Sequence, residues 1–184
     1  PVTNAITFIF DLGVTGDAQN APGDWTFYYD DIQQAADCAD DPTPPAPVLG
    51  VIDFESGTAT FLDFEGGAAA VVPNPAASGA NTSAQVGQMQ KFTGAPFAGS
   101  TLDLGSTVSV ADAASYTMLV RASREVDVTF KLEPLAVERT ATHSGSGEWE
   151  VLCFDFAGVA GETAGITLIF DNGVVGDAEN APAD

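Results

Sequence analysis

The chain has 184 residues, with 5 Lys and Arg against 26 Asp and Glu, and a formal net charge of -21. This charge repels phosphates and anionic lipid headgroups, so we expect no nucleic-acid partner, and no apolar run approaches the roughly 20 residues that membrane insertion needs. Hydrophobic residues make up 45% of the chain, which is too many for a disordered acidic tail.

An internal repeat opens the chain. Residues 6–24 (ITFIFDLGVTGDAQNAPGD) recur as residues 166–184 (ITLIFDNGVVGDAENAPAD), with fourteen of nineteen positions identical at an offset of 160 residues. The first copy continues into WTFYYDDIQ (25–33), whose aromatic and β-branched residues predict a strand. We therefore expect residues 1–35 to be the C-terminal strands of a preceding module, or a donor segment.

Residues 36–47 (ADCADDPTPPAP) are rich in Pro and Asp and predict an extended linker. Residues 48–184 would then form a module that lacks its last strand and has an open edge. Three arrangements stay open for strand 24–33: it completes its own module, a tandem neighbour or a separate chain. The edge-completing residues would be Trp25, Phe27, Tyr29 and Ile32.

Short apolar runs separated by turn residues predict further strands at 51–56, 59–65, 68–74, 86–92, 107–110, 115–123, 126–133, 148–156 and 165–171. Residues 126–133 alternate, with the even-numbered side chains expected in the core. Residues 148–156 alternate too, which places Trp149 on the face opposite Leu152 and Phe154. These strands predict an all-β fold, a two-sheet antiparallel β-sandwich.

Catalytic motifs are not apparent, and we expect no enzyme activity. His143 stands in a polar, turn-like segment without a metal-binding pattern, so we expect a solvated loop histidine. The two cysteines, Cys38 and Cys153, leave two alternatives: a disulfide, or a buried thiol at Cys153 with Cys38 unpaired.

Carboxylates near glycines suit structural calcium, which prefers oxygen ligands. One candidate set is Asp53 and Glu55, together with Asp30 or Asp31. A second candidate loop contributes Asp171 and Asp177. The alternative is that these acids are solvated turn formers.

Exposed aromatic residues would indicate sugar binding, because their faces stack on pyranose rings. The candidates are Trp149, Phe97, and Tyr28 or Trp25, with Arg121 and Lys131 expected as polar partners on the outward faces of adjacent strands. The alternative places these aromatic side chains in the core or in a contact between modules.

The order of DFESG, NTSAQVGQMQKFTGAPFAGS, VTFKLE, GEWEVLCFDF, ITLIFDNG and WTFYYDDIQ resembles jelly-roll carbohydrate-binding modules of the family four and nine type. Such modules occur in secreted and surface proteins of aquatic bacteria. The resemblance implies a jelly-roll-like sandwich, an extracellular or cell-surface location, and a structural calcium site at the positions of Glu55 and Asp30.

Two hypotheses follow. In the first, the chain is a building block of a secreted or cell-surface fibre or adhesin, and its partners are neighbouring copies of the same module. In the second, it is a free-standing module that binds polysaccharide beside a polysaccharide-degrading enzyme. The repeat favours the first hypothesis and the resemblance favours the second, and arrays of sugar-binding modules would combine both through avidity.

Overall fold

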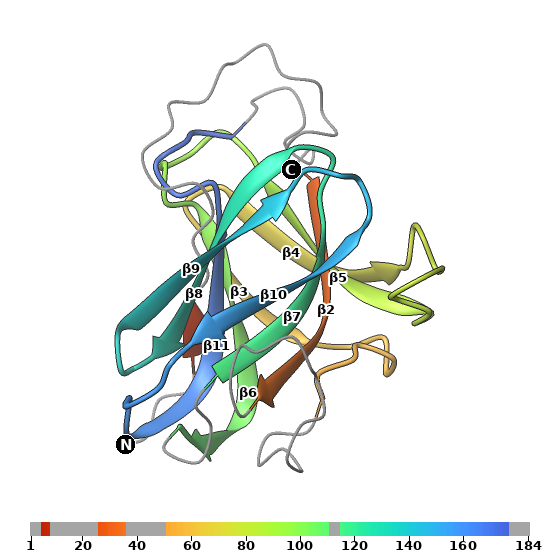
Figure 1. Cartoon of the computed structure of the whole chain (residues 1–184). Coiled ribbons are helices and arrows are strands. Elements are labelled where there is room, and N and C mark those ends of the chain that lie inside the picture. Colours follow the sequence, from red (N-terminus) through yellow and green to blue (C-terminus); the bar gives the residue numbers. More distant parts are fainter. Residues whose placement is uncertain (1–4, 8–25, 36–50, 111–114, 177–184) are drawn as a thin grey trace.

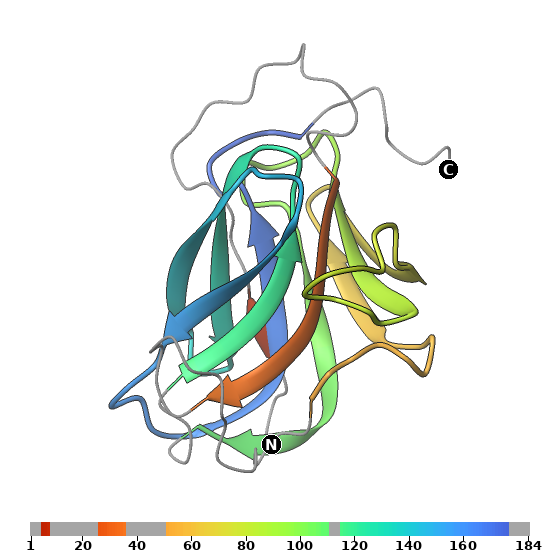
Figure 2. The same ribbon diagram turned by 45° about the vertical axis from the view of Figure 1, so that its right-hand side comes forward.

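The computed structural model describes residues 5–7, 26–35, 51–110 and 115–176, and these residues form strands and connecting loops. Two sheets face each other across an apolar interior (Figures 1 and 2). Sheet A has the strand order β3-β6-β11-β1-β8-β9, and sheet B has the order β10-β7-β2-β5-β4. The predicted all-β, two-sheet sandwich is confirmed, and apart from the parallel pair of β1 and β11 every paired strand is antiparallel.

The strands of sheet A are β1 (Ala5–Thr7), β3 (Thr60–Phe64), β6 (Gly99–Ser109), β8 (Glu125–Glu133), β9 (Val137–Ser144) and β11 (Glu162–Phe170). Those of sheet B are β2 (Thr26–Ala35), β4 (Gly67–Pro73), β5 (Gln85–Lys91), β7 (Ser115–Arg121) and β10 (Trp149–Asp155). One expected strand is absent from the described residues, and one observed strand was not expected. Residues 51–56 contribute only a single bridge at Ile52 before a turn, and β9 was not predicted.

The core forms where the alternating strands of the two sheets meet. In β8 the residues Val126, Val128, Phe130 and Leu132 are at most 1% exposed, as their period of two predicts. Phe130 packs against Phe154 with ring centroids 5.0 Å apart, which joins sheet A to β10 of sheet B. Burial of this many large apolar side chains is the main source of stability for such a sandwich.

Strand β2 lies in the middle of sheet B, between β7 and β5, and not at its edge. Phe27, Tyr29 and Ile32 are fully buried in the core, whereas Trp25 lies outside the described residues. A register shift between Asp30 and Gln33 interrupts the alternation, and it explains why both Tyr29 and Ile32 face inward although they are three positions apart. Strand β2 therefore fills a central place and not one at the outer edge of the sheet.

The two copies of the repeat meet on β8. Ile6 of β1 and Ile166 of β11 both pair with Leu132, and Thr7 and Thr167 both pair with Lys131. Strands β1 and β11 also lie parallel, with Ile6 opposite Ile166, so the pairing keeps the sequence offset of the repeat. Equivalent residues of the two copies therefore pair with the same residues of β8.

Candidate binding face and acidic cluster

A row of polar and aromatic side chains crosses the outer face of sheet B. Tyr28 stands opposite Gln88 of β5 on one side and opposite Arg121 of β7 on the other, and Arg121 stands opposite Trp149 of β10. Because Phe27 points into the core, its neighbour Tyr28 points outward. The side-chain amide of Gln88 donates to the Tyr28 hydroxyl over 3.4 Å. We call these four residues the cross-sheet row.

Trp149 is on the outward face, as its alternation predicts, but it is only 8% exposed. Its indole N–H donates to the carbonyl oxygen of Ala76 over 3.0 Å, and its ring packs with Val86 and Leu119. Ala76 belongs to the loop between β4 and β5, so this loop covers the tryptophan. Tyr28 is therefore the less covered aromatic side chain of the row, since it is only partly buried against the same cluster.

Arg121 and Lys131 do not lie together, contrary to the expectation of adjacent strands. Arg121 is on β7 in sheet B, whereas Lys131 is on β8 in sheet A and forms an ion pair with Glu133. Strands β7 and β8 follow each other in the sequence but belong to different sheets. The Nε atom of Arg121 is buried, and within the described residues it has no hydrogen-bond partner. Phe97 is 49% exposed in the loop between β5 and β6.

A cluster of acidic residues lies at the register shift of β2. Asp30 is fully buried; Asn81 donates to its Oδ2 atom over 2.9 Å, whereas its Oδ1 atom is buried without a hydrogen-bond partner. Burial raises the pKa of Asp30 to about 6, against the lowering effect of hydrogen bonds from the Ser83 and Asn81 side chains and from the Asp31 backbone. Burial and the charges of Asp53 and Glu55 also raise the pKa of Asp31. The cluster therefore carries uncompensated negative charge.

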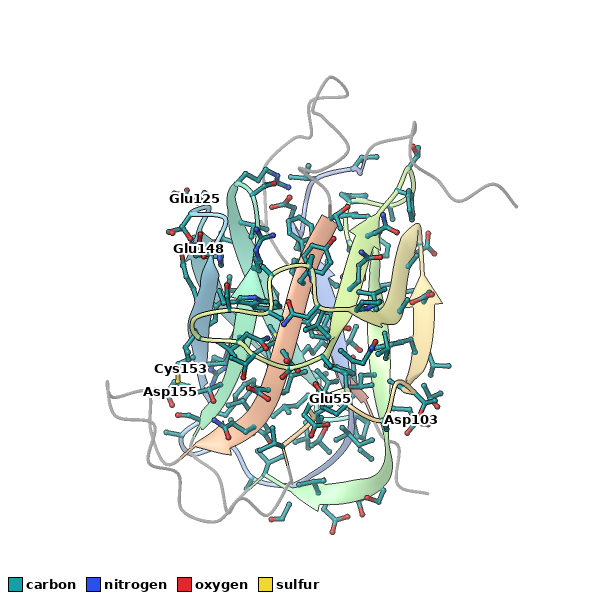
Figure 3. The ribbon with its side chains drawn as sticks, turned by 90° about the vertical axis from the view of Figure 1, so that its right-hand side faces the viewer. Glu55, Asp103, Glu125, Glu148, Cys153 and Asp155 are labelled. Atoms are coloured by element: carbon teal, nitrogen blue, oxygen red, sulfur yellow. The ribbon has the colours of Figure 1, made fainter. Side chains whose placement is uncertain are left out.

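Glu55, labelled in Figure 3, holds the loop between β4 and β5 in place. Its Oε1 atom accepts hydrogen bonds from the backbone N–H groups of Ala84 and Gln85, at 2.7 and 3.2 Å. The backbone N–H of Glu55 in turn donates to Asp53 over 3.1 Å. The same loop covers Trp149 and carries Asn81, so the acidic cluster and the cross-sheet row share one covering element.

Within the described parts of the chain, no group of three or more His, Cys, Asp or Glu side chains is arranged to hold a metal ion. Asp171, the candidate from the second loop, is fully buried and paired with Arg124, while Asp177 lies outside the described residues. A buried lysine fixes this loop, since Lys91 donates to the carbonyl oxygens of Pro96, Phe170 and Asp171 over 2.6 to 2.8 Å. The charge at Asp171 is thus balanced by protein cations.

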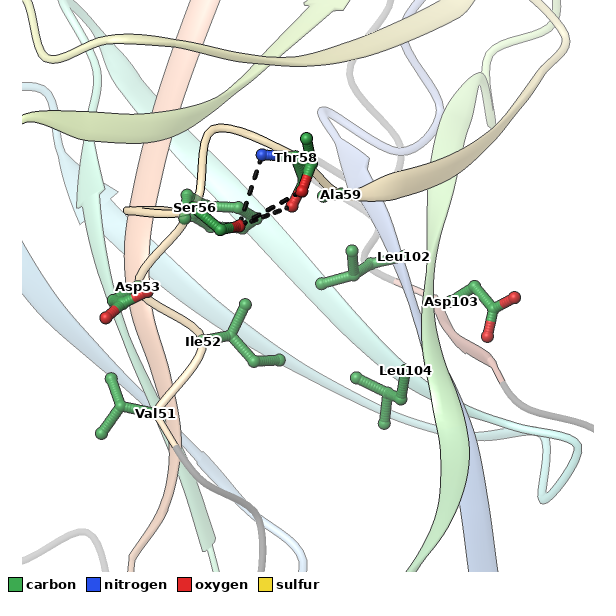
Figure 4. A pocket seen from close by; sticks show the side chains of 10 residues that line it. Val51, Ile52, Asp53, Ser56, Thr58, Ala59, Leu102, Asp103 and Leu104 are labelled. Atoms are coloured by element: carbon green, nitrogen blue, oxygen red, sulfur yellow. Dashed lines mark hydrogen bonds between the residues drawn. The ribbon is translucent and has the colours of Figure 1, made fainter.

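A pocket of about 250 Å³ lies between residues 51–59 and β6. In Figure 4, Ile52 points toward Leu102 and Leu104, whereas Asp103 points to the other side of β6. The hydroxyl of Ser56 lies close to Thr58 at the rim of the pocket. This volume is below the several hundred Å³ typical of sites that enclose an organic ligand.

His143 is fully buried at the end of β9, so the expectation of a solvated loop histidine was wrong. Gly145 donates its N–H to the Nδ1 atom, and the Nε2 atom contacts the carbonyl oxygen of Glu148 over 3.1 Å, which assigns the proton to Nε2. Glu150 lies beside His143. Burial alone would raise the pKa of Glu150, but hydrogen bonds from Ser144 and Ser146 lower it to about 2. These contacts close the turn between β9 and β10 and give His143 a structural role.

Cys153 is disulfide-bonded (its position is labelled in Figure 3). Cys38, the other cysteine of the chain, lies outside the described residues, and the pairing of Cys38 with Cys153 stays a prediction.

Comparison with protein-family models, with curated proteins and with solved structures found no match to this chain. In the part of the chain that the structure describes, no helix is long and apolar enough to cross a membrane.

Proposed function

We propose that this chain is a non-catalytic repeat module that serves as a building block of a secreted or cell-surface fibre or adhesin. The observation that carries the proposal is the shared register of the repeat: residues of β1 and of β11 pair with the same Leu132 and Lys131 of β8. Both copies thus pair with β8 in the same register while they lie beside each other. A chain that contains both is suited to joining successive sandwiches.

The charge of the chain fits an extracellular building block. A net charge of -21 keeps single modules soluble, while the buried core of the sandwich supplies the stability of each unit. The resemblance to carbohydrate-binding modules supports the same location, since such modules belong to secreted and surface proteins. The partners in this proposal are other copies of the module.

Multi-angle light scattering of the purified chain over a range of protein concentrations tests the proposal. We expect the molar mass to rise from that of one chain to that of linear oligomers, because each copy offers its repeat to another copy. Assembly should persist at high salt, since strand pairing and apolar burial are not screened by ions. A constant mass of one chain at every concentration would contradict the proposal.

Calcium is the cofactor we propose for the acidic cluster. The buried carboxylate of Asp30 and the neighbouring charges of Asp31, Asp53 and Glu55 are the features that favour a hard cation, and these carboxylates would have to draw together to bind it, because no three of them are arranged around one point in the described structure. These side chains would supply carboxylate oxygens, and the remaining ligands would be backbone carbonyls or water. When bound, the ion would balance the charge at the end of β2 and fasten the loop between β4 and β5.

A second candidate function is the binding of polysaccharide on the outer face of sheet B. The cross-sheet row favours it, because Tyr28 offers a ring for stacking and Gln88 offers an amide beside it. The buried Nε atom of Arg121 is a hydrogen-bond donor without a partner in the described residues. Because this atom is buried, a sugar hydroxyl would instead be bound by the terminal N–H groups of the partly exposed Arg121. The negative charge of the chain favours a neutral polysaccharide over an acidic one.

Affinity electrophoresis through gels that contain a panel of neutral polysaccharides tests this second function. We expect at least one of them to retard the wild-type chain, and we expect Tyr28→Ala and Arg121→Ala each to weaken that affinity about tenfold or more, which corresponds to about 1.4 kcal/mol. Val151→Ala is the matched control, because Val151 is 58% exposed on β10 outside the row. Equal retardation of the wild type and the three variants would show that the polysaccharide does not bind at the cross-sheet row.

A further inference from the structure

The place of β2 in sheet B is shaped for this strand. Figure 2 shows β2 running between β7 and β5 through the middle of its sheet. The ring of Tyr29 lies against Gly87 of β5, where a Cβ atom would come within 2.6 Å of the ring. Only glycine at position 87 leaves this space. We call the place between β7 and β5 the β2 slot.

All described strands except β1 and β2 come from residues 51–176. Removal of β2 would therefore leave the other strands connected to one another but open the β2 slot through the core. Long connections, residues 8–25 and 36–50, lead to β2 and away from it. Exchange of one identical element between copies is a low-cost route to assembly.

Strand β2 begins where β11 ends. The ring of Phe170, the last residue of β11, stacks on the ring of Phe27 with centroids 4.4 Å apart and an angle of 13°. Arg124 lies over the same Phe27 ring, 5.4 Å from its centroid, and is paired with Asp171 directly after β11. In space, therefore, β11 leads to the start of β2.

In the sequence, however, β2 follows the first copy of the repeat, to which β1 belongs, while β11 belongs to the second copy. Both copies pair with Leu132 and Lys131 of β8 in the same register. Strand β1 pairs with β8 over three residues and β11 over six, so the first copy makes the shorter contact with β8.

From these observations we infer that the β2 slot accepts β2 from a second copy of the chain, so that strand exchange joins neighbouring sandwiches. This inference rests on the proposed function and names the contact by which the modules assemble. The chain's own β2 fills the slot through Tyr29 against Gly87 and Phe27 against Phe170, so the strand that would replace it in an exchange is the β2 of a second copy, which has the same sequence. The prolines at positions 42, 44, 45 and 47 add to the case, since the sequence there favours an extended spacer.

Disulfide crosslinking between two variants, each with one cysteine added to the native pair, tests the inference. Gln90 of β5 stands opposite Thr26 of β2 on one side and opposite Ala68 of β4 on the other. Chains with Thr26→Cys and chains with Gln90→Cys are unfolded together, refolded and oxidised. A link between positions 26 and 90 can then form only between two chains, and peptide mapping separates it from links of the native cysteines.

We expect a covalent dimer linked through positions 26 and 90 from this mixture. The matched control is a mixture of Ala68→Cys and Gln90→Cys chains, which should give no such dimer because β4 and β5 belong to one continuous segment. A single chain carrying both Thr26→Cys and Gln90→Cys shows whether β2 occupies the slot at all.

Three results would overturn the inference. In the first, the double variant forms the link within one chain while the test mixture gives no dimer. In the second, neither the double variant nor the test mixture forms the link. In the third, the control mixture gives as much dimer as the test mixture. If light scattering still shows oligomers in any of these cases, the strand exchange fails and the proposed function stands. If the chain also stays monomeric, both fail.

Discussion

Replacing Phe27 with alanine is expected to lower the free energy of unfolding by about 3–5 kcal/mol, the usual range for a buried phenylalanine. Phe27 is fully buried, stacks on Phe170 and lies under the guanidinium of Arg124. Truncation would leave a cavity between the two sheets at the start of β2. For a chain of this length we expect the melting temperature to fall by roughly 10 °C or more.

The matched control is Tyr28→Ala, one position along the same strand. Tyr28 faces outward and is only partly buried, so we expect its truncation to cost less than half as much. Thermal unfolding followed by circular dichroism measures both variants. If Phe27→Ala melts within about 2 °C of the wild type, which for this length is within about 1 kcal/mol, β2 does not contribute to the core and its central place in sheet B is wrong.

Addition of calcium to chelator-treated protein is expected to raise the melting temperature by roughly 5–10 °C. A ligand that binds only the folded state stabilises it by about 2.7 kcal/mol at a concentration one hundred times its dissociation constant. At roughly 2–4 °C per kcal/mol for a chain of this size, the shift is easily measured. The physical reason is the uncompensated charge of Asp31, Asp53 and Glu55 beside the buried Asp30.

Variants assign this calcium response to the acidic cluster. Asp53→Asn and Asp30→Asn should each abolish most of it, whereas Asp103→Asn should keep it, because Asp103 accepts its hydrogen bond from Gly105 on β6 and is not part of the cluster. Calorimetric titration of the chelated protein gives an independent measurement. The same melting temperature in calcium and in EDTA would contradict the proposal that the acidic cluster binds calcium.

The sequence predicted those features that depend on local pattern. The period of two in β8 placed Val126 and Phe130 in the core, and the aromatic and β-branched run of β2 predicted a strand. Residues 165–171 were predicted as a strand, and β11 covers most of them and pairs with β6 and β8 in sheet A.

Features set by long-range contacts could not be predicted from local pattern. Alternation placed Trp149 on the outward face, but the loop between β4 and β5 covers it through a hydrogen bond to Ala76. Adjacent strands in the sequence suggested that Arg121 and Lys131 lie together, but β7 and β8 belong to different sheets. His143 stands in a polar segment, and only pairing of β9 with β8 buries it.

The acidic candidate residues were predicted in part. Asp30 and Glu55 share contacts with the loop between β4 and β5, through Asn81 and through Ala84 and Gln85. This link depends on the register shift in β2, at which Asp31 has a positive φ of 47°. A bulge of this kind has no sequence signal as clear as a strand's alternation.

Electron microscopy of the assembled material tests the central claim, that the chain is a building block whose copies join into a fibre, most directly. We predict lines of β-sandwiches in which density for residues 26–35 of one copy fills the place between β7 and β5 of the next. Single sandwiches without lateral or end-to-end contacts, at concentrations well above those of the scattering measurement, would contradict the account and leave polysaccharide binding as the function to pursue.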